Sequence, residues 1–163
     1  GDDVWFLPYS IITAKPLSEK FDERILKLKK NNDFDKVDGS ISIGNQTSIG
    51  SYNVLQGYGG IKIGNKVTTS ARVNIYSFSH YPYIDEDRTT VTYANAMVNG
   101  PISCIKSPIV IKDGVWLGLS VSVFSGTLGE NTFVSSFSFV NSNLDENVIA
   151  KGDPAIEISK RFK

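Results

Sequence analysis

The sequence predicts an all-β fold, a parallel β-helix in the shape of a three-sided prism. One observation is the composition: the 163 residues are rich in serine, isoleucine, valine and glycine, which favour strands and turns over helices. The other is a spacing of six between aliphatic residues from residue 41 onward, which neither an amphipathic helix nor an alternating strand maintains. The length suits a single domain, 1–163, with its own core.

The N-terminal part of the chain, residues 1–36, lacks this spacing and predicts short strands followed by one short helix. Ser18 is a suitable N-cap for a helix over 19–30, and lysines fill its other faces toward the C-terminal end. Three apolar residues recur at helical spacing: Phe21, Ile25 and Leu28. We therefore expect an amphipathic helix that packs on the rest of the domain.

The repeat occupies residues 40–150 and appears in four registers. Its aliphatic residues, which we expect to point inward, are Ile43, Ile49, Leu55, Ile63, Ile75, Ile111, Leu117, Val123, Leu128, Val134 and Val140. A prism with six residues on each face uses about 18 residues per coil, so the patterned residues make about four coils and a continuous core. The alternative is a β-sandwich in which the spacing is accidental.

An unpatterned stretch, 80–107, interrupts the repeat and is expected to leave the β-helix as one long loop. Long loops in compact domains usually carry function. The last residues, 151–163, are expected to form a C-terminal tail.

Charge and residue counts exclude several classes of function. Lysine plus arginine and aspartate plus glutamate both number 17, so no net field favours nucleic acid or an anionic membrane. One histidine and one cysteine exclude a multi-histidine zinc site and an internal disulfide, and no metal is expected. No apolar run is long enough for a transmembrane segment. These features predict a cytoplasmic protein.

Two motifs in the C-terminal half carry a resemblance to a known family. Residues 111–118, IKDGVWLG, followed by residues 152–155, GDPA, resemble the hexapeptide-repeat acyltransferases, and the fit extends over 40–160. The resemblance implies a left-handed parallel β-helix. It is strongest to the small sugar O-acetyltransferases and the xenobiotic acetyltransferases, which implies acetyl-CoA as co-substrate and a homotrimer. The chain departs from the family pattern at Phe133, Phe137 and Phe139, where smaller residues are common.

His80 is the candidate catalytic residue. The segment 77–80, SFSH, resembles the part of these enzymes that carries the catalytic histidine, just before the excursion from the β-helix. A neutral imidazole can accept a hydroxyl proton near pH 7, so His80 is expected to act as general base on the acceptor. A surface or core histidine is the structural alternative. Cys104 as a nucleophile is the competing chemistry, but a buried, inert thiol is favoured.

The acceptor is expected to bind in the loop and beside it. Aromatic faces, carboxylates and amides suit a polyhydroxylated molecule such as a sugar or glycan. The candidate substrate-binding residues are Asn74, Tyr81, Tyr83 and Asp85. Asp85, Glu86, Asp87 or a backbone carbonyl would orient His80. The alternative is a loop that only packs against a neighbouring subunit.

The resemblance also implies a groove for CoA. Trp116 would form its wall, Gly118 would let the ligand approach the main chain, and Ser120 would offer a hydroxyl. The candidates near the phosphates and the nucleotide are Lys151, Gly152, Lys160 and Arg161. Trp116 as core filler and a loose basic tail are the structural alternatives.

These expectations combine into one leading function. It is acetyl transfer from acetyl-CoA to a sugar hydroxyl, with surface polysaccharide synthesis as the candidate process. The alternatives are N-acetylation of a nucleotide-linked amino sugar or an antibiotic, and a non-catalytic β-helix scaffold. The sequence does not identify the acceptor.

Overall fold

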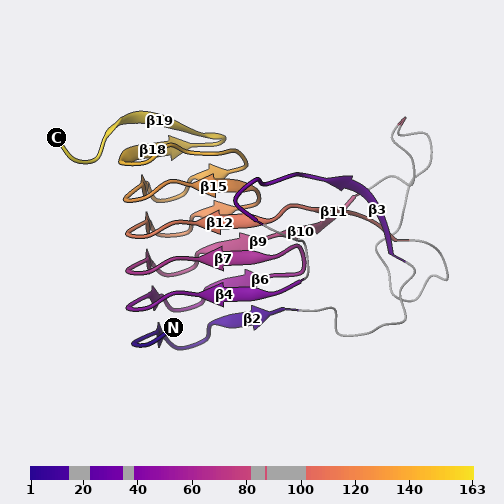
Figure 1. Ribbon diagram of the computed structural model, residues 1–163, viewed down its shortest axis with the longest axis horizontal. Helices are drawn as coiled ribbons and strands as arrows, with labels where there is room; N and C mark the ends of the chain where they lie inside the picture. The colour runs from indigo at the N-terminus through magenta and orange to yellow at the C-terminus, as the bar shows by residue number, and fades with distance from the viewer. Residues whose placement is uncertain (15–22, 35–38, 82–86, 88–101) are drawn as a thin grey trace.

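The computed structural model describes residues 1–14, 23–34, 39–81, 87 and 102–163. The chain is a left-handed parallel β-helix whose coils stack along one axis (Figure 1). Each full coil runs through three flat faces in the same order, which we number 1, 2 and 3. The fold predicted from the six-residue spacing is confirmed.

Three sheets make the faces. Face 1 consists of β4 (Ile41–Ile43), β7 (Ile61–Ile63), β12 (Ile109–Ile111) and β15 (Gly126–Leu128). Face 2 consists of β1 (Trp5–Phe6), β5 (Ser48–Ile49), β8 (Thr68–Thr69), β13 (Trp116–Leu117), β16 (Phe133–Val134), β18 (Val148–Gly152) and β19 (Ala155–Lys160). Face 3 consists of β2 (Ile11–Thr13), β6 (Val54–Gln56), β9 (Asn74–Tyr76), β14 (Ser122–Val123) and β17 (Phe139–Val140).

Three edges join these faces, and each is named by the faces that it joins. Edge 1/2 consists of residues 1–4, 44–47, 64–67, 112–115, 129–132 and 145–148. Edge 2/3 consists of residues 7–10, 50–53, 70–73, 118–121, 135–138 and 151–154. At edge 3/1 the chain leaves the prism twice, after β2 and after β9.

The repeat positions form the core along the axis. The aliphatic residues from Ile49 to Val140 that the spacing selects are buried, and Ile43 packs against them partly buried. The small companions of these residues are buried as well, and polar ones among them bond to the next coil, as Thr47 Oγ1 does to the Gly64 carbonyl oxygen at 2.9 Å. Each coil thus covers the apolar end of its neighbour.

The β-helix begins earlier than the repeat suggested. β1 pairs in parallel with β5, and β2 pairs in parallel with β6, so residues 1–13 form a further coil below residue 41. The repeat does not reveal this coil. Phe6 and Ile12 occupy the positions that pair with Ile49 and Leu55, but the residues around Pro8, between them, do not follow the repeat.

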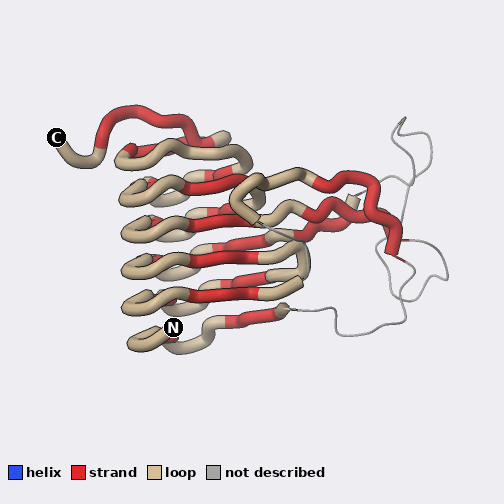
Figure 2. The backbone as a smooth tube through the Cα atoms, viewed as in Figure 1, coloured by secondary structure: helices blue, strands red, loops and turns tan. Residues whose placement is uncertain are grey.

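The helix predicted over 19–30 is wrong in the part that the structure describes. Residues 23–28 form a strand, β3 (Glu23–Leu28), and every regular element among the described residues is a strand (Figure 2). β3 pairs in parallel with β11 (Ile102–Lys106), which pairs antiparallel with β10 (Phe78–His80). Three apolar residues are a weak helical signal, and the backbone partners that β11 offers outweigh it.

Most of the C-terminal residues 151–163, predicted as a tail, belong to strands. β19 folds back antiparallel on β18 and closes face 2 at the end of the prism (Figure 1). The two strands meet at a turn over residues 152–155, the GDPA motif.

Candidate functional site

The strands β3, β10 and β11 form a three-stranded arm that projects from edge 3/1 (Figure 1). Its strands come from both excursions of the chain, because β3 lies in the first and β10 and β11 lie in the second. The stretch predicted as one long loop therefore begins and ends in paired strands.

His80 lies at the end of β10 with its side chain exposed. The imidazole contacts the edge of the Phe78 ring at a centroid distance of 5.4 Å, and Phe78 in turn contacts Tyr58 at 4.7 Å. The Lys106 ammonium lies 4.5 Å from the centre of the Tyr58 ring. His80 thus stands at the open end of an aromatic cluster, where a hydroxyl group can approach it.

The pairing of β10 with β11 places Cys104 directly opposite His80. Directly opposed residues of an antiparallel pair point to the same side of the sheet. This neighbour cannot be recognised from the sequence, because 24 residues separate the two positions in the chain. Cys104 is fully buried, which agrees with the interpretation of a thiol that does not meet substrate.

The residues proposed for the acceptor are only partly described. Tyr81 is buried beside the arm, and its amide donates to the Ser103 carbonyl oxygen at 2.8 Å. Asn74 lies half-buried on face 3, on the strand that leads into β10. Asp87 is exposed. The predicted residues Tyr83, Asp85 and Glu86 lie outside the described residues.

Trp116 lies on face 2, where its indole is 45% exposed. Its Nε1 donates to Ser70 Oγ at 3.4 Å, and its ring contacts Phe133 edge-on at 6.2 Å. Because almost half of the side chain meets solvent, the alternative of a core filler is wrong. An aromatic wall for a ligand is compatible with this position.

Gly118 lies at edge 2/3 in close contact with the next coil. A Cβ at this position would stand 2.7 Å from the Ser136 amide nitrogen and 2.9 Å from the Val134 carbonyl oxygen. The stacking of the coils therefore requires glycine at position 118, independently of any ligand that approaches the main chain there. Ser120, two residues on, has a left-handed backbone with a φ of 56°.

The residues proposed around the CoA phosphates separate into two groups. Lys151 and Gly152 lie at edge 2/3, where the Gly152 amide donates to Ser138 Oγ at 3.1 Å. Arg161 lies at edge 1/2 instead, and its Nη1 donates to the carbonyl oxygens of Gly114 and Asn131, both at 3.0 Å. Lys160 pairs with Val148 at the same edge. The structure therefore does not bring Lys160 and Arg161 to the Trp116 side.

His80 and Trp116 lie on opposite sides of the prism. The arm leaves at edge 3/1, and in a three-sided prism this edge lies opposite face 2, which carries Trp116.

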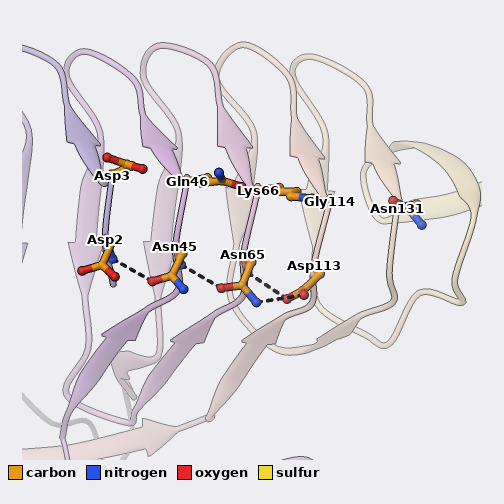
Figure 3. A pocket seen from close by; sticks show the side chains of 9 residues that line it. All are labelled: Asp2, Asp3, Asn45, Gln46, Asn65, Lys66, Asp113, Gly114 and Asn131. Atoms are coloured by element: carbon orange, nitrogen blue, oxygen red, sulfur yellow. Dashed lines mark hydrogen bonds between the residues drawn. The ribbon is translucent and has the colours of Figure 1, made fainter.

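Edge 1/2 holds a polar recess of about 580 Å³ that the sequence analysis did not identify (Figure 3). A ladder of Asn and Asp side chains lines it. In this ladder, a side-chain oxygen of one turn accepts a hydrogen bond from a backbone amide of the preceding turn. Asn45 Oδ1 accepts from the Asp2 amide at 2.7 Å, Asn65 Oδ1 from the Asn45 amide at 2.8 Å, and Asp113 Oδ1 from the Asn65 amide at 2.8 Å. Hydrogen bonds from the side chain and backbone of Asn65 lower the pKa of Asp113.

This ladder satisfies the backbone of the turns and contains none of the predicted site residues. An Asn or Asp at the same place in successive turns was the signal that could have revealed it. Within the described residues, no group of three histidine, cysteine or acidic side chains is arranged to hold a metal ion. The same residues contain no helix long and apolar enough to cross a membrane.

Comparison with known proteins relates the chain to acetyltransferases. No family model matches it. A protein of Mycobacterium tuberculosis named as a probable acetyltransferase, Rv3034c, is 30% identical over 125 residues, which are 76% of this chain and 38% of that protein. A candidate colanic acid biosynthesis acetyltransferase of Escherichia coli, WcaF, is 41% identical over 58 residues, 35% of this chain and 32% of that protein. The chain spans less than half the length of the curated relatives it matches.

A solved structure shares both the fold and part of the sequence. The hexapeptide-repeat acetyltransferase VCA0836 from Vibrio cholerae, in complex with acetyl coenzyme A, superposes with a TM-score of 0.62 at 27% identity. The alignment covers 89% of this chain and 74% of that one. The resemblance that the repeat and the two motifs indicated is therefore confirmed.

Proposed function

We propose that this chain carries the acetyl-transferring part of a hexapeptide-repeat acyltransferase and moves an acetyl group from acetyl-CoA to a sugar hydroxyl. The observation that carries the proposal is the exposed His80 on an arm of this β-helix, in a segment that resembles the part of these enzymes with the catalytic histidine. VCA0836, which shares the fold and 27% of the aligned sequence, is bound to acetyl-CoA. The similarity to WcaF supports a polysaccharide or one of its precursors as acceptor.

In the proposed step, the His80 imidazole accepts the proton of the acceptor hydroxyl as its oxygen attacks the thioester carbonyl carbon. A carbon–oxygen bond forms and the carbon–sulfur bond breaks. The proton then passes from His80 to the leaving thiolate, so the products are an acetyl ester and CoA with a free thiol. No covalent bond to the protein is needed, which fits the burial of Cys104.

The active site of this proposal lies between two copies of the chain. His80 and Trp116 occupy opposite sides of one prism, so the arm of one copy would reach face 2 of its neighbour. Repeating such a head-to-tail contact closes a ring, and three copies give the trimer that the resemblance implies. A cytoplasmic location remains a prediction that the single cysteine supports.

The test is an acetyl-transfer assay with acetyl-CoA and a panel of sugars, nucleotide sugars, oligosaccharides and amino sugars, with products identified by mass spectrometry. We expect an O-acetylated sugar from the wild type and almost none from His80→Ala. Cys104→Ala is the matched control at the opposed position and should keep its activity. Transfer to an amine alone would contradict O-acetylation, and full activity of His80→Ala would contradict the assignment of the base.

A further inference from the structure

Three exposed aromatic residues, Trp5, Tyr9 and Tyr52, gather at the N-terminal end of the prism, and we call them the aromatic platform. Trp5 is 68% exposed, Tyr9 73% and Tyr52 56%. Trp5 lies on β1 of face 2, and Tyr9 follows at edge 2/3 of the same coil. Tyr52 lies at that edge on the next coil, where its ring stacks on the Tyr9 ring at a centroid distance of 4.9 Å.

The backbone of the two tyrosines is unfavourable for residues of their size. Tyr9 has a φ of 64° and Tyr52 a φ of 59°, both in the left-handed region that glycine, asparagine and aspartate adopt more easily. The stack offsets part of this cost, but it leaves more than half of each side chain in solvent. A small residue would make these turns with less strain. The rings therefore indicate a contact outside the fold of one chain.

The surroundings of the platform suit a sugar chain. The turns that carry the tyrosines, residues 7–10 and 50–53, contain no charged residue, whereas attraction to an anionic membrane surface requires lysine or arginine. Exposed tryptophan and tyrosine rings offer apolar faces to the apolar side of a sugar ring, and the tyrosine hydroxyls donate and accept hydrogen bonds. A polyhydroxylated ligand thus matches both the aromatic area and the lack of charge.

Face 2 connects the platform with the wall predicted for CoA. Strand pairing forms one outward column in which each residue is the partner of the next: Trp5, Ser48, Thr68 and Trp116. Ser48 and Thr68 are half-buried and add hydroxyl groups to the surface between the two tryptophans. The three pairings of about 4.8 Å each place Trp116 about 14 Å from Trp5 along the axis. This distance exceeds the length of one sugar unit, so an oligosaccharide is needed to span it.

We propose that the aromatic platform binds the acceptor polysaccharide several units away from the one that is acetylated, and that the sugar chain continues along face 2 toward the active site. This inference rests on the proposed function, since it takes a sugar as the acceptor. It adds that the acceptor is a chain rather than a single sugar. A chain held at both places gains affinity, because the second contact forms within the same complex.

The experiment measures the affinity for three bacterial polysaccharides, colanic acid, xanthan and gellan, each freed of O-acetyl groups by alkali. The wild type should bind at least one of them. Tyr9→Asn and Tyr52→Asn introduce a residue that tolerates the left-handed turn, so the fold should persist while the affinity falls about 5- to 30-fold. Trp5→Ser introduces the residue that stands next in the column, at position 48, and should have a similar effect.

Two further variants serve as controls. Tyr9→Phe keeps the ring and should retain most of the affinity. Gln46→Asn changes an exposed, left-handed residue on the coil of Tyr52 but at edge 1/2, and it should bind like the wild type. In acetyl-transfer assays, the platform variants should raise the KM for the polysaccharide and leave the KM for a single sugar and for acetyl-CoA unchanged.

Three results would overturn the inference. The first is wild-type affinity for the polysaccharide in the folded platform variants. The second is a wild type that acetylates small sugars but binds none of the three polysaccharides, which would leave the proposed function intact. The third is a changed sedimentation coefficient in the platform variants, which would assign the rings to a contact between copies. Polysaccharide binding through the platform without any acetyl transfer would instead remove the proposed function and keep the platform as a sugar site.

Discussion

At the scale of single residues, His80 is the group on which the proposed chemistry depends. It is the one histidine of the chain, so its removal leaves no other imidazole to accept the proton. Its imidazole contacts the Phe78 ring, which cannot accept a proton, and Cys104, which lies opposite His80 in the β10–β11 pair, is fully buried.

We therefore expect His80→Ala to lower kcat about 10²- to 10⁴-fold, the usual effect of losing a general base, with little change in the KM for acetyl-CoA. Steady-state kinetics with the same acceptor measure both effects. A wild-type kcat in the folded variant would show that another group accepts the proton.

A second prediction concerns Gly118. Because a Cβ there would stand 2.7 Å from the Ser136 amide nitrogen, Gly118→Ala should lower the free energy of unfolding by about 1–3 kcal/mol. The urea midpoint measures this. A substitution at Gly118 would therefore disturb the fold as well as the approach of CoA to the main chain that we expect there. An unchanged midpoint would show that the coils separate easily at this point.

At the scale of elements, the ladder of edge 1/2 ties successive turns together. Asn65 has two partners in it: its Oδ1 accepts from the Asn45 amide, and its Nδ2 donates to Asp113 Oδ2 at 2.9 Å. Asn65→Ala removes both bonds at a partly exposed site, so we expect a loss of about 1 kcal/mol near pH 7, measured by urea unfolding.

The effect of this substitution should depend on pH. The side-chain bond from Asn65 is the largest cause that lowers the pKa of Asp113 below its ordinary value of 3.8. A lowered pKa adds stability above the unfolded value and loses it as the pH falls through the folded value. The stability difference between the wild type and Asn65→Ala should therefore shrink below about pH 3.8. A constant difference down to pH 2.5 would mean that Asp113 does not contribute.

The elements also show which parts of the fold can be predicted from the sequence. The repeat predicted the faces and the buried positions because inward residues such as Ile75 and Leu117 must be aliphatic on every face. It failed for β3, because the partner of that strand, β11, lies in a distant part of the chain. It placed Trp116 and Ser120 on one side of the prism but could not separate Arg161 from them, since the hairpin of β18 and β19 decides where the C-terminus lies.

At the scale of the whole molecule, the proposed active site needs two copies. The arm at edge 3/1 carries His80, and the opposite face carries Trp116. The arrangement of the faces alone thus predicts that the two residues act from different chains. Sedimentation should show a trimer at micromolar concentration, and an active monomer would contradict the composite site.

Mixing two variants gives the sharper test. His80→Ala and Trp116→Ala should each be almost inactive alone. After unfolding and refolding together in equal amounts, about a quarter of the sites of a randomly mixed trimer combine an intact His80 from one chain with an intact Trp116 from its neighbour. Activity should then return to about a quarter of the wild-type value. If both residues acted from the same chain, no mixed trimer would contain an intact site, so a mixture as inactive as its components would refute the composite site.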